Sequence, residues 1–264
     1  MTDVAPGEMA GVWTALVLAA GRPDDPLAEA EGVPNKTLID VHGRSCLQRV
    51  LDALAAAPSV GRVVVAIEDA NLLDGVDPRP EAARAADRVS DTVASGLRQL
   101  GPPLLIVTGD HALLTPEMVE EFVGAAAAAG AGVAAGMAAR TTIEAAYPDV
   151  RRTYMKFAED GYSGCNLFAL ASAEAEKALA FWQEVDRKRK RPWALIKAID
   201  PWAFTLYAAG KLTLEKGMDR LSKKLGMTAI AVRMSAAEAA IDVDKPDDLK
   251  LVRAIVARRA LSSA

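Results

Sequence analysis

The chain has 264 residues, of which 51% are apolar and 25% charged, and its formal net charge is −4. This length suits one large α/β domain or two small ones, and the weakly acidic balance gives the chain no global attraction to nucleic acid or to an anionic membrane. No apolar run approaches the roughly 20 residues that cross a bilayer, and the N-terminal MTDVAPGEMAG lacks the basic start of a signal peptide. The two cysteines, Cys46 and Cys165, show no metal-like pairing and favour a reducing, cytoplasmic location.

Strands and helices alternate in the first half of the chain. Continuous apolar or β-branched runs predict buried strands at residues 13–19, 63–67, 104–108 and 132–137. Apolar residues at helical spacing predict helices at 46–57 and 89–100, and a third that opens at Thr115-Pro116-Glu117 and stops at Gly130. Helices of this length between strands imply parallel βαβ units in a doubly wound sheet.

The second half is less regular. Short strands are predicted at residues 152–158, 166–170, 228–233 and 241–243, and a last amphipathic helix opens at Pro246. Because no linker or internal repeat divides the chain, residues 1–264 are predicted to form a single domain in which residues 173–226 are a helical elaboration. The basic run at 187–191 within it is interpreted as a solvated helix end, with recognition of an anionic acceptor as the alternative.

Charged residues accompany the ends of three predicted strands. Arg22 and Lys36 follow the first strand, Asp110 follows the strand at 104–108, and Asp242 and Asp244 accompany the short strand near the end. Because ligands bind outside the carboxyl ends of parallel strands, these side chains are expected to converge on one crevice. A lysine beside a pair of carboxylates that bind Mg²⁺ is what phosphoryl chemistry needs. Each residue alone also has an ordinary explanation, as a solvated lysine, a turn former or a helix cap.

Three motifs follow one another along the chain: LVLAAGR with the downstream NKTLIDVHGRSCLQRVLDAL, then LLIVTGDHALLTPEMVEEF, then IDVDKPDDLKLV. In this order they resemble the motifs of the MobA-like NTP transferase family. The resemblance implies a three-layer α/β/α sandwich with a mostly parallel, Rossmann-like sheet of the glycosyltransferase-A-like type. It also implies transfer of a nucleotidyl group from an NTP to a small phosphorylated or hydroxylated acceptor, with release of pyrophosphate and use of Mg²⁺.

The resemblance assigns roles to the positions that match. Lys36 and Arg22 are implied to be catalytic, with Lys36 clamping the phosphates at the end of a loop that covers them. Asp110 and Asp244 are implied to bind the metal, and Asp242 stays open as an alternative to Asp244. The implied nucleotide-binding residues, with N–H groups of the first loop facing phosphate oxygens and Ser95-Gly96 beside the base, are Ala19, Ala20, Gly21, Arg22, Lys36, Ser95, Gly96 and Asp110. The implied acceptor-binding residues are Gly164, Asn166 and Lys156, the last in a basic cluster with Arg151 and Arg152.

The first loop, GRPDDPLAEAEGVPNK, departs from the G-x-G-x-R-M that is usual in the family and is longer. Two other functions therefore stay open. A glycosyltransferase that uses a sugar nucleotide would carry D-x-D at the end of a central strand, where this chain has only Gly109-Asp110. A non-catalytic nucleotide-binding relative would tolerate the altered loop. The acceptor, the preferred base and the oligomeric state are left open by the sequence.

Overall fold

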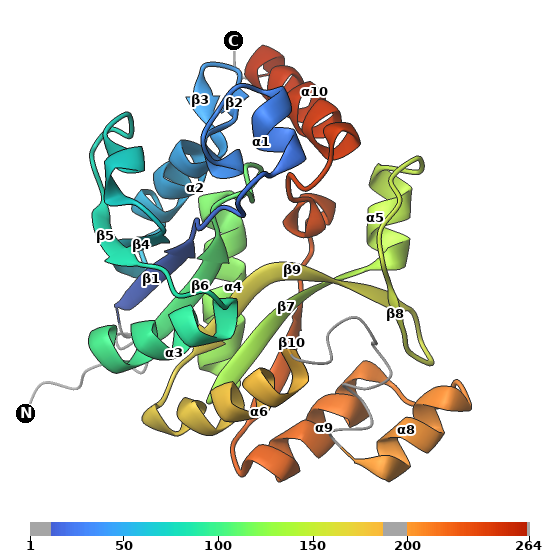
Figure 1. Cartoon of the computed structure of the whole chain (residues 1–264). Helices are drawn as coiled ribbons and strands as arrows, with labels where there is room; N and C mark the ends of the chain where they lie inside the picture. The colour runs from blue at the N-terminus through green and yellow to red at the C-terminus, as the bar shows by residue number, and fades with distance from the viewer. Residues whose placement is uncertain (1–11, 187–199, 263–264) are drawn as a thin grey trace, which may run out of the picture.

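The computed structural model describes residues 12–186 and 200–262. Its centre is an 8-stranded sheet in the order β10-β7-β9-β6-β1-β4-β5, with β8 paired to β9 outside this path (Figure 1). The strands are β1 (Trp13–Leu18), β4 (Val60–Ile67), β5 (Glu81–Arg84), β6 (Leu104–Thr108), β7 (Val133–Ala139), β8 (Met155–Lys156), β9 (Gly161–Leu170) and β10 (Ala229–Arg233). β9 is antiparallel to its neighbours, whereas the other pairings along the path are parallel. The predicted mostly parallel sheet is confirmed.

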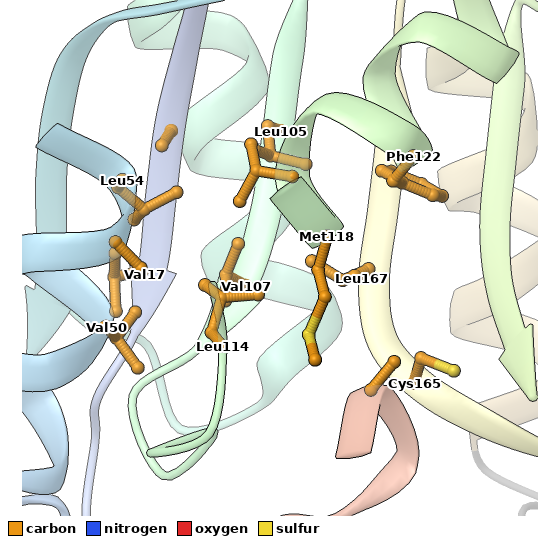
Figure 2. Packing of buried hydrophobic residues seen from close by; sticks show 14 of the residues in the cluster. Val17, Val50, Leu54, Leu105, Val107, Leu114, Met118, Phe122, Cys165 and Leu167 are labelled. Carbon is orange, nitrogen blue, oxygen red and sulfur yellow. The ribbon is translucent and has the colours of Figure 1, made fainter. Parts of the chain in front are cut away.

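Helices cover both faces of this sheet. On one face, α2 (Cys46–Ala55) and α4 (Pro116–Ala128) pack their apolar side chains against β1, β6 and β9 (Figure 2). On the other face lie α3 (Val89–Leu100), α6 (Glu176–Asp186) and α9 (Leu214–Leu225). Successive strand residues point to opposite faces, so Val17 joins the first of these cores and Leu16 the second. The predicted three-layer α/β/α sandwich is thus the observed architecture.

A further group of elements lies beyond the carboxyl ends of β1 and β6. It consists of α1 (Pro26–Ala30), η1 (Lys36–Leu38), the hairpin of β2 (Asp40–Val41) and β3 (Arg44–Ser45), and α10 (Pro246–Ser262) (Figure 1). α1, β2 and α10 contribute to a separate hydrophobic cluster, called the crest cluster below. Its buried members are Leu27, Ile39, Val41, Cys46, Ala112, Leu113, Ile241, Val243, Leu249, Val252, Ile255 and Val256. The crest cluster joins the long first loop to the last helix of the fold.

The local sequence explains where several helices begin. Thr115 accepts a hydrogen bond from the N–H of Met118, and Pro116 takes the first position of α4, as the T-P-E pattern predicts. Ser45 caps α2 in the same way by accepting from the N–H of Gln48. These caps use N–H groups that have no partner within the helix.

The structure corrects some predicted elements. Residues 241–243 form no strand, because the alternation of Ile241 and Val243 arises from burial of an irregular segment in the crest cluster. The strand predicted at 152–158 is reduced to β8, and the strand predicted at 166–170 extends back to Gly161. Elements that were not predicted are β5, the hairpin β2–β3, α1, α5 (Arg140–Ala146) and the short helices η1, η2 (Ala70–Leu73) and η4 (Ala237–Ala240).

The predicted helical region is largely helical where the structure describes it. It contains η3 (Ala173–Ala175), α6, α8 (Pro201–Ala208) and α9. The basic run at 187–191 and the N-terminal segment 1–11 lie outside the described residues. Within the described chain, none of the helices is both long enough and apolar enough to cross a membrane.

Candidate active site

Lys36 is held at the end of β1 by its neighbour Asn35. The buried Asn35 amide donates to the Ala19 carbonyl at 2.8 Å and to Glu68 Oε1 at 2.9 Å. Its Oδ1 accepts from both the N–H and the hydroxyl of Thr37, at 2.8 and 2.9 Å, and so caps η1. All four hydrogen-bonding positions of the amide are therefore used. Lys36 is presented by a fixed turn, not by a solvated loop.

Asp110 follows β6 in a tight turn that begins at Gly109. The N–H of Gly109 donates to the Leu18 carbonyl at 2.8 Å. A Cβ at Gly109 would lie 3.1 Å from both Ala19 Cβ and Thr37 Cγ2, so glycine permits the two strand ends to approach. The Asp110 side chain is only 11% exposed. Its Oδ1 is buried and has no hydrogen-bond partner in the part of the chain that the structure describes.

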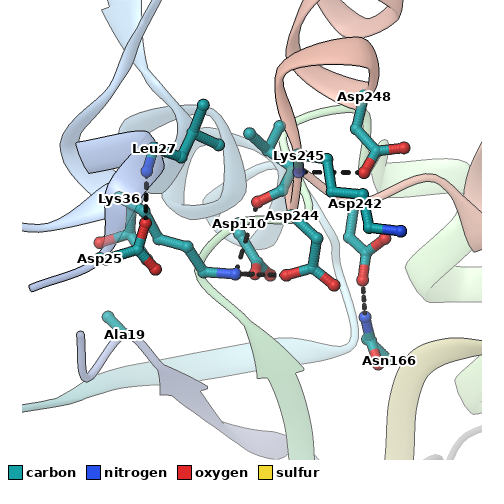
Figure 3. Close-up of polar contacts among 12 residues, drawn as sticks. Ala19, Asp25, Leu27, Lys36, Asp110, Asn166, Asp242, Asp244, Lys245 and Asp248 are labelled. Atoms are coloured by element: carbon teal, nitrogen blue, oxygen red, sulfur yellow. Dashed lines mark hydrogen bonds and ion pairs between the residues drawn. The ribbon is translucent and has the colours of Figure 1, made fainter. Parts of the chain in front are cut away.

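Asp244 reaches the same place from the segment before α10. The N–H of Val243 donates to the Asp110 carbonyl at 3.1 Å, while the Val243 side chain is buried in the crest cluster. Lys36 Nζ then lies 2.5 Å from Asp244 Oδ1 and 2.6 Å from Asp110 Oδ2, so that one ammonium bridges two carboxylates (Figure 3). The three charged residues predicted from separate strand ends thus meet at a single point.

The contact of Lys36 with Asp110 and Asp244, called the bridge below, also sets the charge states of Lys36 and Asp244. Burial acts to lower the pKa of Lys36, but the charges and hydrogen bonds of Asp110 and Asp244 outweigh it and raise the pKa above its ordinary value. Burial acts to raise the pKa of Asp244, but Lys36 lowers it overall, with smaller contributions from Arg152 and the exposed Arg22. Lys36 is therefore a cation, and Asp244 an anion, at neutral pH.

Asp242 belongs to a different network from Asp244. Arg152 Nη1 donates to Asp242 Oδ1 at 2.6 Å, and Asn166 Nδ2 donates to Asp242 Oδ2 at 2.7 Å. Arg152 Nη2 lies a further 3.4 Å from Asp248 Oδ1. The side chains of Arg152 and Asp242 are 12% and 16% exposed. Both oxygens of Asp242 thus accept from Arg152 and Asn166, whereas Asp244 shares Lys36 with Asp110.

Asn166 points at this network because β9 is bulged there. Its φ is 52°, and the register of β9 against β7 shifts between Ala135 and Met137. A left-handed conformation is uncommon for a residue other than glycine, and β-bulges re-aim side chains next to active sites. Gly164, on the same strand, is exposed, and a Cβ built on it would meet no atom within 4 Å. Packing in the described fold therefore does not require glycine at this position.

Arg152 and Lys156 of the predicted basic cluster, which also includes Arg151, make contacts in different parts of the fold. Arg152 turns to Asp242 and Asp248, whereas Lys156 is exposed on β8, where its N–H donates to the hydroxyl of Tyr207 at 3.3 Å. The main chain of Lys156 is therefore bonded to α8, and Lys156 makes none of the contacts given above for Lys36, Asp110 and Asp244.

The first loop is the segment expected to cover the phosphates. The N–H of Ala19 donates to the Ala66 carbonyl, and the N–H of Gly21 donates to Glu68 Oε2, each at 2.9 Å. These two N–H groups are therefore bonded within the fold, and the expectation that the first loop faces phosphate oxygens stays a proposal. Leu27 of the same loop is buried in the crest cluster. The loop is consequently a packed part of the fold.

Ser95 and Gly96 lie in the middle of α3, away from the carboxyl end of the sheet. A Cβ at Gly96 would lie 2.5 Å from Leu16 Cδ2, so the glycine allows α3 to pack closely on β1. The hydroxyl of Ser95 accepts a hydrogen bond from Gln99 Nε2 at 2.9 Å. These contacts give both residues a structural role within the helix, so the structure does not bring them to the bridge.

Replacing Gly96 with alanine is therefore expected to lower the free energy of unfolding by about 1–3 kcal/mol, because the added methyl group overpacks the buried Leu16. The KM for the nucleotide should not change. Urea denaturation and steady-state kinetics measure the two effects. Gly124→Ala, at an exposed glycine of α4, is the matched control and should be neutral or stabilising. A raised KM for the nucleotide at unchanged stability would instead support the prediction that Gly96 lies beside the base.

Residues that the sequence did not single out support this site. Asn35 directly precedes Lys36. Glu68 directly follows β4, and residues at the carboxyl ends of strands are the ones that border ligand sites in such sheets. Glu68 accepts hydrogen bonds from both Gly21 and Asn35, so it fixes the two ends of the first loop. Arg152, considered only as part of a basic cluster, holds Asp242 beside the bridge.

The bridged carboxylates fit a divalent cation. No group of three or more His, Cys, Asp or Glu residues among the described residues is arranged to hold a metal. Mg²⁺ commonly uses one or two protein carboxylates and keeps its other positions for water and phosphate, so Asp110 and Asp244 suffice. The buried, unpartnered Oδ1 of Asp110 is an acceptor of the kind that such an ion would use.

Comparison with known proteins places this geometry in a family context. Residues 15–195 match the family model described as the MobA-like NTP transferase domain. A 3-deoxy-manno-octulosonate cytidylyltransferase of Rhodospirillum centenum is 27% identical over 244 residues, which are 86% of this chain and 89% of the relative. The enzyme of the same name from Syntrophotalea carbinolica is 33% identical over 98 residues, which are 34% of this chain and only 38% of that relative.

Solved structures share the fold. A hypothetical transferase from Thermus thermophilus superposes with a TM-score of 0.78 at 29% identity, covering 90% of this chain and 99% of the other. A CMP:2-keto-3-deoxy-manno-octonic acid synthetase in complex with CTP superposes with a TM-score of 0.60 at 17% identity, covering 94% and 99% of the two chains. The chain therefore shares its three-layer fold with these two proteins.

Proposed function

Because the chain belongs to the MobA-like NTP transferase family, we propose that it transfers a nucleotidyl group from an NTP to a small hydroxylated or phosphorylated acceptor and releases pyrophosphate. The observation that carries this proposal is the contact of one lysine with two carboxylates at the carboxyl end of the sheet. Such a group combines a fixed positive charge with a pair of metal ligands, which are the two parts that phosphoryl chemistry uses.

Each residue of the bridge has a separate part in the proposed reaction. Lys36 places its ammonium where negative charge grows on the phosphoryl oxygens, and Asn35 keeps its backbone fixed during the reaction. Asp110 and Asp244 hold Mg²⁺, which when bound neutralises phosphate oxygens and orients the reacting groups. Arg22, exposed at the start of the first loop, contacts the outgoing pyrophosphate in this scheme.

The acceptor is proposed to lie along β9. Asn166 borders the bridge through Asp242, and the exposed Gly164 leaves open space on the same strand. The names of the relatives favour CTP as the first nucleotide to test and a sugar acid as the first acceptor. The buried free cysteines, Cys46 and Cys165, are consistent with a reducing, cytoplasmic setting.

Release of pyrophosphate is the direct test. The protein is incubated with Mg²⁺ and each of the four ribonucleoside triphosphates, with 3-deoxy-manno-octulosonate, sugar phosphates or polyol phosphates as acceptors. The proposal predicts pyrophosphate release only when NTP and acceptor are both present, with transfer of an α-³²P label to the acceptor. Release of a nucleoside diphosphate from a sugar nucleotide would instead identify a glycosyltransferase. Nucleotide binding without turnover on the whole panel would identify a non-catalytic relative.

Replacing Gly164 with alanine tests the acceptor side. The added methyl group meets no protein atom within 4 Å, so thermal stability should not change. If the acceptor packs on this strand, the methyl group should lower kcat/KM for the acceptor by about tenfold, the effect of a modest steric conflict. The KM for the nucleotide should stay the same and serves as the internal control. Unchanged acceptor kinetics would place the acceptor elsewhere.

A further inference from the structure

Lys36 occupies the position between the two carboxylates. Its Nζ lies 2.6 Å from Asp110 Oδ2 and 2.5 Å from Asp244 Oδ1, and 3.4 Å from the Val243 carbonyl. The Lys36 side chain is only 19% exposed, whereas that of Asp244 is 55% exposed. The ammonium is thus inserted between the carboxylates, and Asp244 forms the solvent side of the contact.

A divalent ion held by Asp110 and Asp244, whether through Asp110 Oδ2 or through the buried, unpartnered Oδ1, would lie close to the Lys36 ammonium. Cation–oxygen distances for Mg²⁺ are about 2.1 Å, and an ammonium in contact with the same two carboxylates would lie within a few ångströms of the ion. At such a separation, in a partly buried site, repulsion between the two cations is strong. While the ammonium lies between Asp110 and Asp244, it therefore opposes the binding of a divalent ion to the same pair.

The backbone of Lys36 is fixed, but its side chain can adopt another conformation. Asn35 and the turn η1 hold the main chain of Lys36 to the end of β1. The flexible four-carbon stem allows the ammonium to move without any change of that backbone. A triphosphate beside the carboxylates offers the ammonium a new partner of higher negative charge.

We propose that Lys36 is an internal competitor of the divalent ion, so that Asp110 and Asp244 bind the ion tightly only when the triphosphate draws the ammonium away. The proposal rests on the proposed function, because it takes Mg²⁺ and an NTP to be the ligands of this site. Metal and nucleotide then bind cooperatively, and by linkage each raises the affinity of the protein for the other. The nucleotide-free protein should bind divalent ions weakly.

Binding of Mn²⁺ to the nucleotide-free protein tests the competition without any turnover. The free ion is measured by electron paramagnetic resonance during titration of wild type, Lys36→Met and Lys245→Met. Methionine keeps most of the length of the side chain and removes its charge. Lys245, exposed next to Asp244, is the matched control, because its replacement changes the net charge equally without touching the bridge.

The Lys36→Met variant should bind Mn²⁺ at least about tenfold more tightly than wild type, because loss of the competing charge frees both carboxylates. The Lys245→Met variant should stay within about threefold of wild type, the change expected from long-range charge alone. Adding Asp110→Asn to Lys36→Met should abolish the gain. Equal affinities in wild type and Lys36→Met, or an equal gain in both lysine variants, would overturn the proposal.

A second measurement on the wild-type chain covers the case in which Lys36→Met does not fold. Trace acetylation with acetic anhydride, read by mass spectrometry, reports how free each lysine is. Millimolar Mg²⁺ should raise the acetylation of Lys36 relative to Lys245, since the ion displaces the ammonium from the carboxylates. An unchanged ratio up to saturating Mg²⁺ would overturn the competition. Pyrophosphate release by the wild type is measured separately, so failure of this proposal is distinct from failure of the proposed function.

Discussion

Replacing Asp110 with alanine is expected to lower the rate of pyrophosphate release by about 10²-fold or more, the scale of a lost preorganised charge at a reacting phosphate. The variant removes the buried carboxylate that contacts Lys36 and that would hold the metal. The fold should be kept, because Gly109 and Val243 are bonded through main-chain atoms that alanine retains. Pyrophosphate release under saturating substrates and the thermal midpoint measure the two properties.

The control for this variant is Asp219→Ala, which removes an exposed carboxylate of α9 and should leave the rate unchanged. Asp110→Asn keeps the shape of the side chain and should lose nearly as much activity as Asp110→Ala. Full activity in a folded Asp110→Ala protein would remove Asp110 from the metal site.

Replacing Asp244 with asparagine is expected to raise the Mg²⁺ concentration for half-maximal rate at least tenfold, roughly the effect of disturbing a metal ligand or its support. The substitution removes a formal charge from the pair but keeps the shape of the side chain. Turnover at low Mg²⁺ should fall as well, and high Mg²⁺ should partly rescue the rate by mass action. If Asp244 only begins α10, the substitution should be nearly silent, since asparagine caps a helix about as well as aspartate.

Asp242→Asn supplies the matched comparison, because the two aspartates are two residues apart and serve different networks. Asp242 accepts from Arg152 and Asn166 in a partly buried pair, so its replacement should lower the thermal midpoint more than Asp244→Asn does. Its effect on the Mg²⁺ requirement should be the smaller of the two. Identical Mg²⁺ dependence in wild type and Asp244→Asn would leave Asp110 without its proposed partner.

That Lys36 and Asp110 lie at the same edge of the sheet could be predicted from the sequence, because each comes after an apolar run that can be explained only as a buried strand. The apolar runs at β1 and β6 are long enough to be buried on both faces, and parallel strands place their carboxyl ends at the same edge. Asp110 directly follows β6 and Lys36 ends the loop that follows β1, so both were expected at this edge of the sheet. Their contact at 2.6 Å agrees with that reasoning.

The sequence does not decide whether Asp242 or Asp244 lies beside Asp110. The alternation of Ile241 and Val243 predicts a strand with Asp242 and Asp244 on one face, but burial in the crest cluster gives the same pattern in irregular backbone. Which aspartate meets Lys36 depends on Arg152 and Asn166, which hold the other one. Such long-range pairs leave no periodic pattern in the chain.

The packing of the first loop could not be predicted for a related reason. The resemblance implies a loop that covers the phosphates, and a single buried leucine, Leu27, does not reveal from the sequence that this loop packs on the fold. The partners of Leu27 lie in α10, and Glu31 of the loop pairs with Arg253 of the same helix at 2.6 Å. The five-residue helix α1 is too short to show amphipathic periodicity, so only the tertiary structure identifies it.

The bridge also joins a part of the chain that is synthesised early to a part that is synthesised late. Lys36 and Asp244 are 208 positions apart, whereas Lys36 and Asp110 both belong to the first half of the chain. Domains emerge from the ribosome N-terminus first, at about 5–20 residues per second. The roughly 134 residues from Asp110 to Asp244 take about 7–27 seconds to be added at this rate. During that interval the Lys36–Asp110 pair lacks its second carboxylate, and the bridge is complete only once the segment before α10 has been made.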